Sequence, residues 1–553
     1  MNIDVYTGLS RLACTSLLIC CLGACSPKDD NSIDTATDGV KANPLIVLGI
    51  DGATWRVIDP LLEAGELPNF QRLLDRGMRG HLMTLTPQAS PVIWNTIATG
   101  HFGRQHGILD FVTPYNGEAG KPVESGLRQE PAIWNIASAY DKRAIVIDYF
   151  VSHPAEPING IMVSDRSNQL IAGADYPEDA LAPLRPELSK LRQAATRKKL
   201  WAEFLGWEYD PNGPQADDPQ YAQAYDILSY AVSRRIIVAD YYRQATAHLI
   251  HQDFDVFISY FWLVDYVSHA FWQYYDDTEF TEKPDAFSKQ LLGDAIPQGY
   301  RLMDQILGNI IDHASQNANI VIVSDHGFGS ATGRHRLGAE KYQHLSGNHR
   351  PVGIIMAAGP DIRPGTVEGM TIVDVMPLLS ALAGLPISDE LPGELDHRIL
   401  SEEFLTSTPV NYTPQYDFTW RSNQPNNLEI DDPAQTERLK SLQGLGYISE
   451  GFELAETTTN GVFDFWQSKE ELLLKHLTGE LSFFALRGDT LAVENLLSLV
   501  WQRNPELIRP LIKRTEAAVQ SLMLHTPANT IPSDHLTQFQ QTSQQFLKAR
   551  VHQ

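Results

Sequence analysis

The chain has 553 residues, of which 43% are hydrophobic and 20% charged, an ordinary balance for a globular protein. Lys and Arg number 43 against 68 Asp and Glu, so the net charge of −25 argues against non-specific binding of nucleic acid. The four cysteines are Cys14, Cys20, Cys21 and Cys25, and their position excludes an internal disulfide or a thiolate metal site in the rest of the chain. Any metal ion there has to use His, Asp, Glu or hydroxyl ligands.

The N-terminus carries an apolar run, RLACTSLLICCLGAC at 11–25, which is short for a membrane span and typical of a signal-peptide core. It ends in Leu22-Gly23-Ala24-Cys25, which resembles the lipobox of bacterial lipoproteins and implies cleavage before Cys25 and lipidation of its sulfur. We therefore expect a signal peptide over 1–24, a flexible tether over 25–43, and a lipid anchor at the cell envelope, on the periplasmic or extracellular face. A cytosolic protein with a chance apolar start is the alternative.

The ordered part begins at PLIVLGIDGA, 44–53, an apolar strand that ends in Asp51. Helical periodicity follows over 57–77, with a break near Gly65 to Pro68, and residues 88–100 indicate a turn that enters a helix. Further strand candidates are 143–150, 254–262, 319–325 and 352–359. Helical stretches separate several of them, so the pattern predicts an α/β fold with a mixed, mostly parallel sheet flanked by helices.

Three changes of composition divide the chain further. Residues 177–250 are rich in Ala, Leu, Arg and Gln and predict a helical insertion within a catalytic domain over 44–405. The polar, turn-rich stretch 406–436 predicts a linker. From 437 to 553 the pattern is helical, which predicts a helical C-terminal region.

Acidic side chains lie at or just past the ends of predicted strands, at Asp51, Asp265 and Asp325. In an open α/β sheet the connecting loops converge at the carboxyl ends of the strands, so functional groups collect there. Asp265 and His269 are four residues apart and project from one face of a helical turn, and His326 follows Asp325 directly. Carboxylates with imidazoles suit a divalent metal ion such as zinc.

Ser90, before a helix-like segment, and His349, just before a strand, complete the candidates. Because His349 precedes a strand, the rule that functional groups collect at the carboxyl ends of strands does not predict that it joins the site. Each candidate taken singly has an ordinary structural explanation, such as a turn at Asp51-Gly52 or a helix cap at Ser90. Three Asp and three His near strands, in a chain without other thiols, favour a site when they are taken together.

The order Asp51, Ser90, Asp265-x-x-x-His269, Asp325-His326 and His349 resembles the alkaline phosphatase superfamily. It is most similar to the type I phosphodiesterase / nucleotide pyrophosphatase branch and its bacterial phosphohydrolase and phosphomutase-like relatives. The segments IVLGIDGA, SPVIWNTIATG, HGILDF, VIVSDHGFG, GIIMAAGPDIRPG and LPGELDHRIL match this pattern over roughly residues 44–400. The resemblance implies an alkaline-phosphatase-like fold and a phosphoric ester hydrolase, most specifically a phosphodiesterase, acting on a small phosphorylated substrate.

The resemblance also implies two divalent metal ions, usually zinc, about 4 Å apart. One ion would be held by Asp265, His269 and His349, and the other by Asp51, Asp325 and His326. Ser90 would lie between the ions, contact them and attack phosphorus, forming a phosphoserine that water then hydrolyses. The start of a helix at Ser90 would favour the anionic phosphate.

Two departures from related patterns matter. Nucleotide pyrophosphatases carry an asparagine shortly after His-Gly-Ile, whereas here Asp110 leads into Phe111, and Asn95 is a weak substitute. Ser90-Pro91-Val92-Ile93-Trp94 does not fit the Cys/Ser-x-Pro-x-Arg frame of arylsulfatases, which argues against that class.

Two alternatives stay open. A phosphomutase or phosphotransferase would use the same site and pass the phosphoryl group to an alcohol. A non-catalytic envelope lipoprotein would use the C-terminal helices to bind an unknown protein partner, although a solvated face explains them better. For the aromatic cluster Tyr260, Phe261, Trp262, Tyr266, Phe271 and Trp272, core packing is favoured over a pocket.

Overall fold

The computed structural model describes residues 42–115, 119–191, 193–206, 218–219, 233–331, 345–420, 436, 439–440, 442–443, 453–454, 465–528 and 530–550. The predicted signal peptide, most of the tether, Cys25 and the later part of the predicted linker lie outside these residues. Within the described part of the chain, no helix has the length and apolar character needed to cross a membrane.

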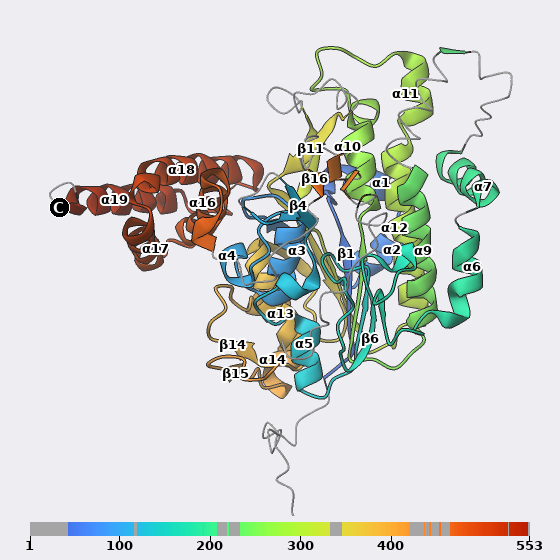
Figure 1. Cartoon of the computed structure of the whole chain (residues 1–553), viewed down its shortest axis with the longest axis horizontal. Helices are drawn as coiled ribbons and strands as arrows, with labels where there is room; N and C mark the ends of the chain where they lie inside the picture. The colour runs from blue at the N-terminus through green and yellow to red at the C-terminus, as the bar shows by residue number, and fades with distance from the viewer. Residues whose placement is uncertain are drawn as a thin grey trace, which may run out of the picture. The chain divides into compact units, whose positions relative to one another are not determined.

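A nine-stranded sheet forms the centre of the fold (Figure 1). Its strands are β1 (Leu45–Ile50), β2 (Gly77–Met83), β5 (Ala144–Ile147), β6 (Gly160–Val163), β7 (Asp175–Tyr176), β8 (Val256–Phe261), β9 (Asn319–Val323), β12 (Val352–Ala358) and β13 (Gly365–Thr371). Their order is β13-β2-β12-β9-β1-β8-β5-β6-β7. Strands β9, β1, β8, β5 and β6 are parallel neighbours, whereas β12 is antiparallel to β9 and β2, and β7 to β6. The predicted mixed, mostly parallel, alkaline-phosphatase-like sheet is confirmed.

Helices cover both faces of the sheet because its central strands are apolar on both sides. In β1, Leu45 and Val47 belong to one core cluster and Ile46 and Leu48 to the other. The first cluster contains the helices α3 (Ser90–Thr99), α5 (Ile133–Ala139) and α13 (Val375–Leu382). The second contains α1 (Trp55–Glu63), α2 (Pro68–Leu74), α9 (Ser233–Leu249), α10 (Leu263–Tyr275) and α12 (Ala295–His313). The two sets of helices flank the sheet in Figure 1.

The helical pattern over 57–77 resolves into α1 and α2, with the predicted break between them. Gly65 has a φ of +72°, in the left-handed region that glycine tolerates, and Pro68 occupies the first turn of α2, where a missing N–H is tolerated. Strand β2 was not predicted, because its sequence GMRGHLM shows little β-branched or alternating pattern.

Short strands lie outside the main sheet. β10 (Gly327–Ser330) and β11 (Gly347–Arg350) form an antiparallel pair, β14 (Ile387–Ser388) pairs with β15 (Tyr412–Thr413), and β4 (Ala119–Pro122) pairs with β3 (Val112–Thr113) and β16 (Glu453–Leu454). The expectation of helix from 437 to the end is wrong at β16. Its two residues find hydrogen-bonding partners in β4, more than 300 positions earlier in the chain, which local periodicity cannot reveal.

Beyond the sheet, the chain continues as the helices α16 (Glu470–Arg487), α17 (Thr490–Arg503), α18 (Ile508–His525) and α19 (Ser533–Arg550). α16 packs directly on the segment around α3 and α4 (Gly103–His106): Arg104 Nε and Nη2 donate to the Glu480 carboxylate at 3.0 and 2.6 Å. His476 Nε2 lies 2.8 Å from the carbonyl oxygen of Leu109. The division between a catalytic domain and a helical C-terminal region stays a prediction.

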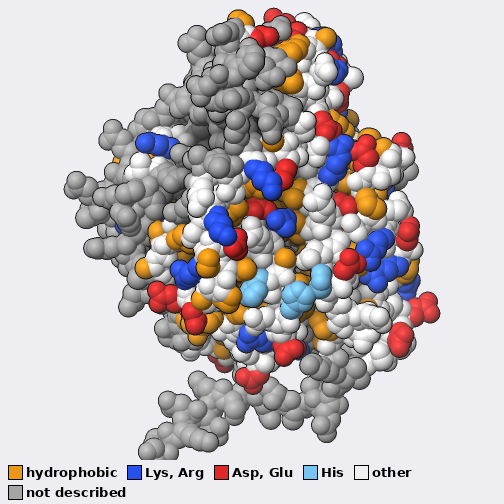
Figure 2. All heavy atoms as spheres, turned by 90° about the vertical axis from the view of Figure 1, so that its right-hand side faces the viewer, with side chains coloured by type: hydrophobic (Ala, Val, Ile, Leu, Met, Phe, Trp, Pro, Cys, Tyr) orange, Lys and Arg blue, Asp and Glu red, His pale blue; other side chains and the backbone are white. Residues whose placement is uncertain are grey.

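Smaller helices complete the described part: α6 (Arg185–Lys190) and α7 (Ala194–Leu205) within the predicted insertion, α11 (Ala286–Leu292) and α14 (Glu402–Ser407). On the face drawn in Figure 2, acidic and basic side chains are interspersed. The net negative charge therefore does not gather there into a patch of one sign.

Candidate active site

Three aspartates converge at one edge of the sheet because their strands are neighbours. The order β9-β1-β8 places the parallel strands before Asp325, Asp51 and Asp265 side by side. Asp51 directly follows β1, and Asp325 lies two residues after the end of β9. Asp265 lies in the first turn of α10, which follows β8. All three side chains are fully buried. The carboxyl ends of parallel strands meet at the same edge, so the sheet itself assembles this acidic cluster.

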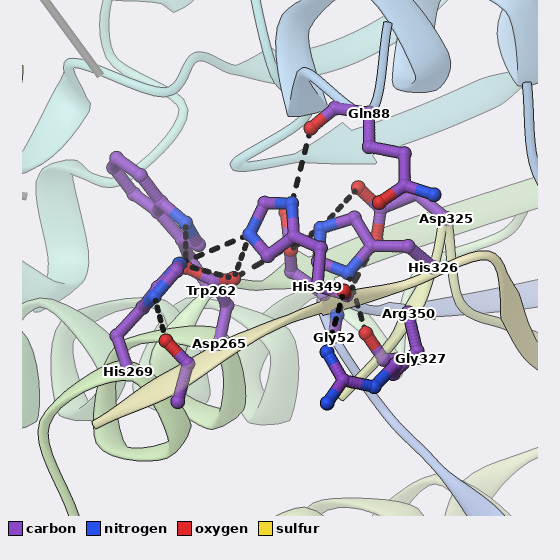
Figure 3. A network of polar contacts seen from close by, with 12 residues as sticks. Gly52, Gln88, Trp262, Asp265, His269, Asp325, His326, Gly327, His349 and Arg350 are labelled. Atoms are coloured by element: carbon purple, nitrogen blue, oxygen red, sulfur yellow. Dashed lines mark hydrogen bonds and ion pairs between the residues drawn. The ribbon is translucent and has the colours of Figure 1, made fainter. Parts of the chain in front are cut away.

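The β10–β11 hairpin brings His349 to the same place. Phe328 in β10 pairs with His349 in β11, and β10 begins four residues after β9 ends. The imidazole rings of His326 and His349 stack with centroids 3.6 Å apart (Figure 3). His349 therefore joins the cluster through a hairpin, which the strand-end rule could not anticipate.

Asp265, His269 and His349 form one compact set. Asp265 Oδ1 lies 3.2 Å from His349 Nε2 and 3.4 Å from His269 Nε2. The two Nε2 atoms are 3.0 Å apart. These three residues are the ones that sequence reasoning assigned to the first ion.

Asp51, Asp325 and His326 form the second set. His326 Nε2 lies 3.4 Å from both Asp51 Oδ1 and Asp325 Oδ2. It also lies 3.9 Å from Asp265 Oδ1, and ligand atoms of Asp265, His326 and His349 fall within 4.8 Å of one another. His326 is thus placed between the two sets, whereas the sequence pattern assigned it to one.

Each histidine turns its Nδ1 atom toward a backbone carbonyl. His269 Nδ1 lies 3.1 Å from Gly347 O, and His326 Nδ1 lies 3.1 Å from Gly327 O. His349 Nδ1 lies 3.0 Å from the carbonyl oxygen of Gln88, in the segment before Ser90. A carbonyl can only accept, so Nδ1 carries the proton in each neutral ring and the Nε2 lone pair faces the acidic cluster. This is the tautomer that a metal-binding histidine requires.

The electrostatics of the cluster favour a bound cation. Burial raises the pKa of Asp51 well above its usual range, and the carboxylates of Asp325 and Asp265 raise it further. Burial, with Asp265 next, has the same effect on the pKa of Asp325. Burial and the neighbouring His349 hold the pKa of His326 well below its usual value. The ionised forms of Asp51 and Asp325 therefore need added positive charge, whereas His326 is already held in the neutral form that can bind a metal.

Ser90 is the first residue of α3, and its side chain is fully buried. Ser90 Oγ has no hydrogen-bond partner among the described residues. Trp94, one turn later on the same face of α3, donates its indole N–H to Asp51 Oδ2 at 3.0 Å. The helix therefore connects Ser90 to the acidic cluster, and Gln88 connects it to His349.

Aromatic side chains hold the aspartates, a role that the sequence analysis missed. Tyr260 donates to Asp51 Oδ2 at 2.6 Å, and the Trp262 indole donates to Asp265 Oδ2 at 3.2 Å. Phe261, Phe271 and Trp272 are buried in the second core cluster, as expected. The available signal was position, since Tyr260 and Trp262 end the strand that leads to Asp265.

The predicted insertion borders a cavity beside these aromatic residues. Arg235 on α9 stacks on the rings of Trp262 and Tyr266, with its guanidinium carbon 4.5 and 4.2 Å from their centroids. Arg235, Tyr260 and Trp262 line a cavity of about 90 Å³. This cavity places α9 at the edge of the candidate site.

The departure from the nucleotide pyrophosphatase pattern is also visible. Asn95 Nδ2 donates to the Pro91 carbonyl at 2.7 Å, so its amide is engaged inside α3. Asp110 Oδ1 accepts the N–H of Phe111 at 2.8 Å, and burial raises the pKa of Asp110. Neither contact replaces the asparagine of nucleotide pyrophosphatases.

A comparison with family models agrees with this fold. The family described as Type I phosphodiesterase / nucleotide pyrophosphatase matches residues 45–367, more than half of the chain. The chain belongs to this family. All seven candidate residues lie within the matched range.

No curated protein matches the chain. Among solved structures, phosphonoacetate hydrolase from Sinorhizobium meliloti 1021 shares 16% identity at a TM-score of 0.32, over 53% of this chain and 58% of that one. Murine ectonucleotide pyrophosphatase / phosphodiesterase 5 shares 13% identity at a TM-score of 0.34, over 65% of this chain and 100% of that one. The match to the hydrolase thus spans about 58% of its length.

Proposed function

We propose that the protein is a metal-dependent phosphodiesterase that forms a phosphoserine at Ser90. One observation carries the proposal: three imidazoles present Nε2 atoms to three buried carboxylates while carbonyls hold their Nδ1 atoms. The diester preference is supported by the name of the family.

The donor set fits two divalent cations. Asp51 Oδ1, Asp325 Oδ2, His326 Nε2 and Ser90 Oγ are buried without a hydrogen-bond partner among the described residues. The facing Nε2 lone pairs of His269 and His349, 3.0 Å apart, repel one another unless a positive charge lies beside them. Asp265, His269 and His349 would hold one ion, and Asp51, Asp325 and His326 the other. Oxygen and nitrogen donors without thiolate suit zinc, among other metals.

Ser90 is the group of this chain that would react. Its Oγ would form a bond to phosphorus while the bond to the leaving alcohol breaks and that alcohol gains a proton. Water would then attack phosphorus in this intermediate, which still carries the second ester group, releasing a phosphomonoester and restoring the Ser90 hydroxyl. When bound, the ions supply positive charge for the attacking and leaving oxygens. Trp94 and Tyr260 orient the Asp51 carboxylate, and the Gln88 carbonyl orients His349.

The test compares bis-p-nitrophenyl phosphate with p-nitrophenyl phosphate as substrates of the zinc-loaded protein. We expect faster cleavage of the diester, and a loss of at least 1000-fold, on the order of a removed nucleophile, in Ser90→Ala. Ser543→Ala is the matched control, because Ser543 on α19 is also a buried serine whose hydroxyl has no partner among the described residues. Unchanged cleavage by Ser90→Ala would exclude the phosphoserine.

A second experiment separates hydrolysis from transfer. Acid quenching during turnover, followed by mass spectrometry of the peptide that contains Ser90, should detect the phosphoserine. Added glycerol or ethanol should yield a diester of that alcohol, alongside the phosphomonoester released by water, only if alcohols compete with water for the intermediate. Transfer as the main product would favour the phosphotransferase alternative.

A further inference from the structure

A cavity of about 350 Å³ lies between His349 of the candidate active site and the C-terminal helices. Gln88 and His349 line it on the side of the site, and Ser482 on α16 and Ala518 and Ser521 on α18 line it on the other. Its volume falls within the range of roughly 300–1,000 Å³ typical of small-molecule sites. The cavity therefore shares a wall with the residues that would hold metal and reaches beyond them.

The helical wall of this cavity is fixed in place by close contacts. A Cβ atom on Gly479 would lie 2.0 Å from the carbonyl oxygen of Thr86, so α16 approaches this segment at the backbone. The carboxylate of Glu480 accepts two hydrogen bonds from Arg104, and His476 contacts Leu109 O. α16 thus packs on the segments on either side of α3, which begins at Ser90.

The side chains that line the cavity favour some kinds of ligand over others. None of the described residues that line the cavity is Asp or Glu, although the chain has a net charge of −25. Its basic side chains are Arg350, His349 and His525, and Arg350 also lies 3.9 Å from Glu279, which does not line the cavity. Leu486 and Leu522 supply apolar surface. Such a lining suits an uncharged or anionic group with an apolar face and disfavours a cation.

We propose that this cavity binds one ester group of the phosphodiester, an uncharged or anionic alcohol moiety with an apolar face. The proposal rests on the proposed function and adds to it the substrate class. Because the family match ends at residue 367, α16 and α18 lie outside it, and the selectivity belongs to the C-terminal part of this chain.

The test uses three diesters that release p-nitrophenolate and differ in the group retained on phosphorus: methyl, phenyl and choline. Ala518→Trp and Ser521→Trp would fill the cavity, whereas Ala517→Trp and Gln520→Trp are matched controls at exposed positions of the same helix. Wild type should favour phenyl p-nitrophenyl phosphate over p-nitrophenylphosphorylcholine. Ala518→Trp and Ser521→Trp should each raise KM for the phenyl ester by about tenfold or more. The KM for the methyl ester should change by less than about twofold.

Binding without turnover gives a second readout. In Ser90→Ala, calorimetry should show weaker binding of the phenyl ester of p-nitrobenzylphosphonate when Ala518→Trp or Ser521→Trp is added, and unchanged binding of its methyl ester. Thermal unfolding of each variant shows whether it folds. Because two lining positions are tested, the second variant still tests the proposal if the first does not fold. Equal changes in KM or in affinity for the phenyl and methyl esters would contradict the proposed subsite. A wild-type preference for the choline ester would contradict it as well. If wild type cleaves no diester at all, the proposed function fails instead.

Discussion

The indole of Trp94 donates a hydrogen bond of 3.0 Å to Asp51, and Trp94 lies one helical turn beyond Ser90. A single helix thereby orients both a residue suited to bind metal and the hydroxyl suited to attack phosphorus. Trp94 Nε1 and Tyr260 Oη share the same carboxylate oxygen, Oδ2, and leave Oδ1 turned toward His326. The orientation of Asp51 is therefore decided by two aromatic donors.

Trp94→Phe should weaken metal binding by roughly 10- to 100-fold, the usual effect of removing a hydrogen bond to a metal ligand. The ring is largely retained, so the principal loss is the donor to Asp51. Competitive titration with a chelating dye measures the affinity directly. Trp134→Phe is the matched control, because Trp134 is fully buried and its Nε1 has no partner among the described residues. Equal affinities of both variants would contradict the role of Trp94.

Removal of metal should lower the melting temperature and abolish diester cleavage, and added zinc should restore both. A ligand that binds only the folded state stabilises it by mass action, by about 4 kcal/mol at a thousandfold excess over the dissociation constant. Calorimetry after dialysis against a chelator, with elemental analysis of the reloaded protein, measures the stability and the number of ions. Full stability and activity at zero metal content would contradict the proposed site.

Stability should fall as the pH drops from 6.5 toward 4, in part because of His476. Burial lowers the pKa of His476 to about 4, so in this window the unfolded state binds more protons than the folded state. A shift of this size corresponds to about 3 kcal/mol at most, spread over the window. His476→Gln should flatten the dependence of the free energy of unfolding on pH, as urea denaturation at several pH values would show.

The comparison for that experiment is His313→Gln on α12, where the side chain is exposed. This variant should keep the slope of wild type. A wild-type slope in His476→Gln would mean that other groups account for the acid sensitivity.

Gly479→Ala should lower the free energy of unfolding. Inside a helix this change usually stabilises a protein by about 1 kcal/mol, so the expected result is the opposite of the usual one. The new methyl group would lie 2.0 Å from Thr86 O, and overpacking of this kind usually costs about 1–3 kcal/mol. Because Thr86 lies four residues before Ser90, kcat should fall as well. Gly299→Ala in α12 is the comparison, since its nearest neighbour is a side-chain methyl of Val267 at 3.1 Å. A more stable Gly479→Ala protein would show that α16 does not pack as described.

We propose that a lipid on Cys25 anchors the protein to the cell envelope. Cys25→Ser should move it from the membrane fraction to the soluble fraction and prevent labelling by a fatty-acid probe. Cys21→Ser changes a cysteine inside the predicted signal peptide and should leave both properties unchanged. Membrane association of Cys25→Ser at the wild-type level would contradict the anchor.

Much of the fold was predictable because its signals are local. The apolar runs at β1, β8, β9 and β12 carry enough hydrophobic residues to specify strands buried on both faces. β2 was missed because six of its seven residues are Gly, Met, Arg or His, and β16 because its partner in β4 is remote. Strands whose stability comes from their neighbours leave little trace in their own sequence.

The available donors can be read from the amino-acid sequence, and so can the positions of Asp51, Asp265 and Asp325 after buried strands. A strand of this kind delivers the next residue to the edge of the sheet wherever the strand lies. Three relationships appear only in the folded chain: β9, β1 and β8 are adjacent, His349 enters through a hairpin, and α16 and α18 line a cavity beside it. These relationships depend on packing between segments tens to hundreds of residues apart, and local hydrophobic periodicity carries no information about such distances.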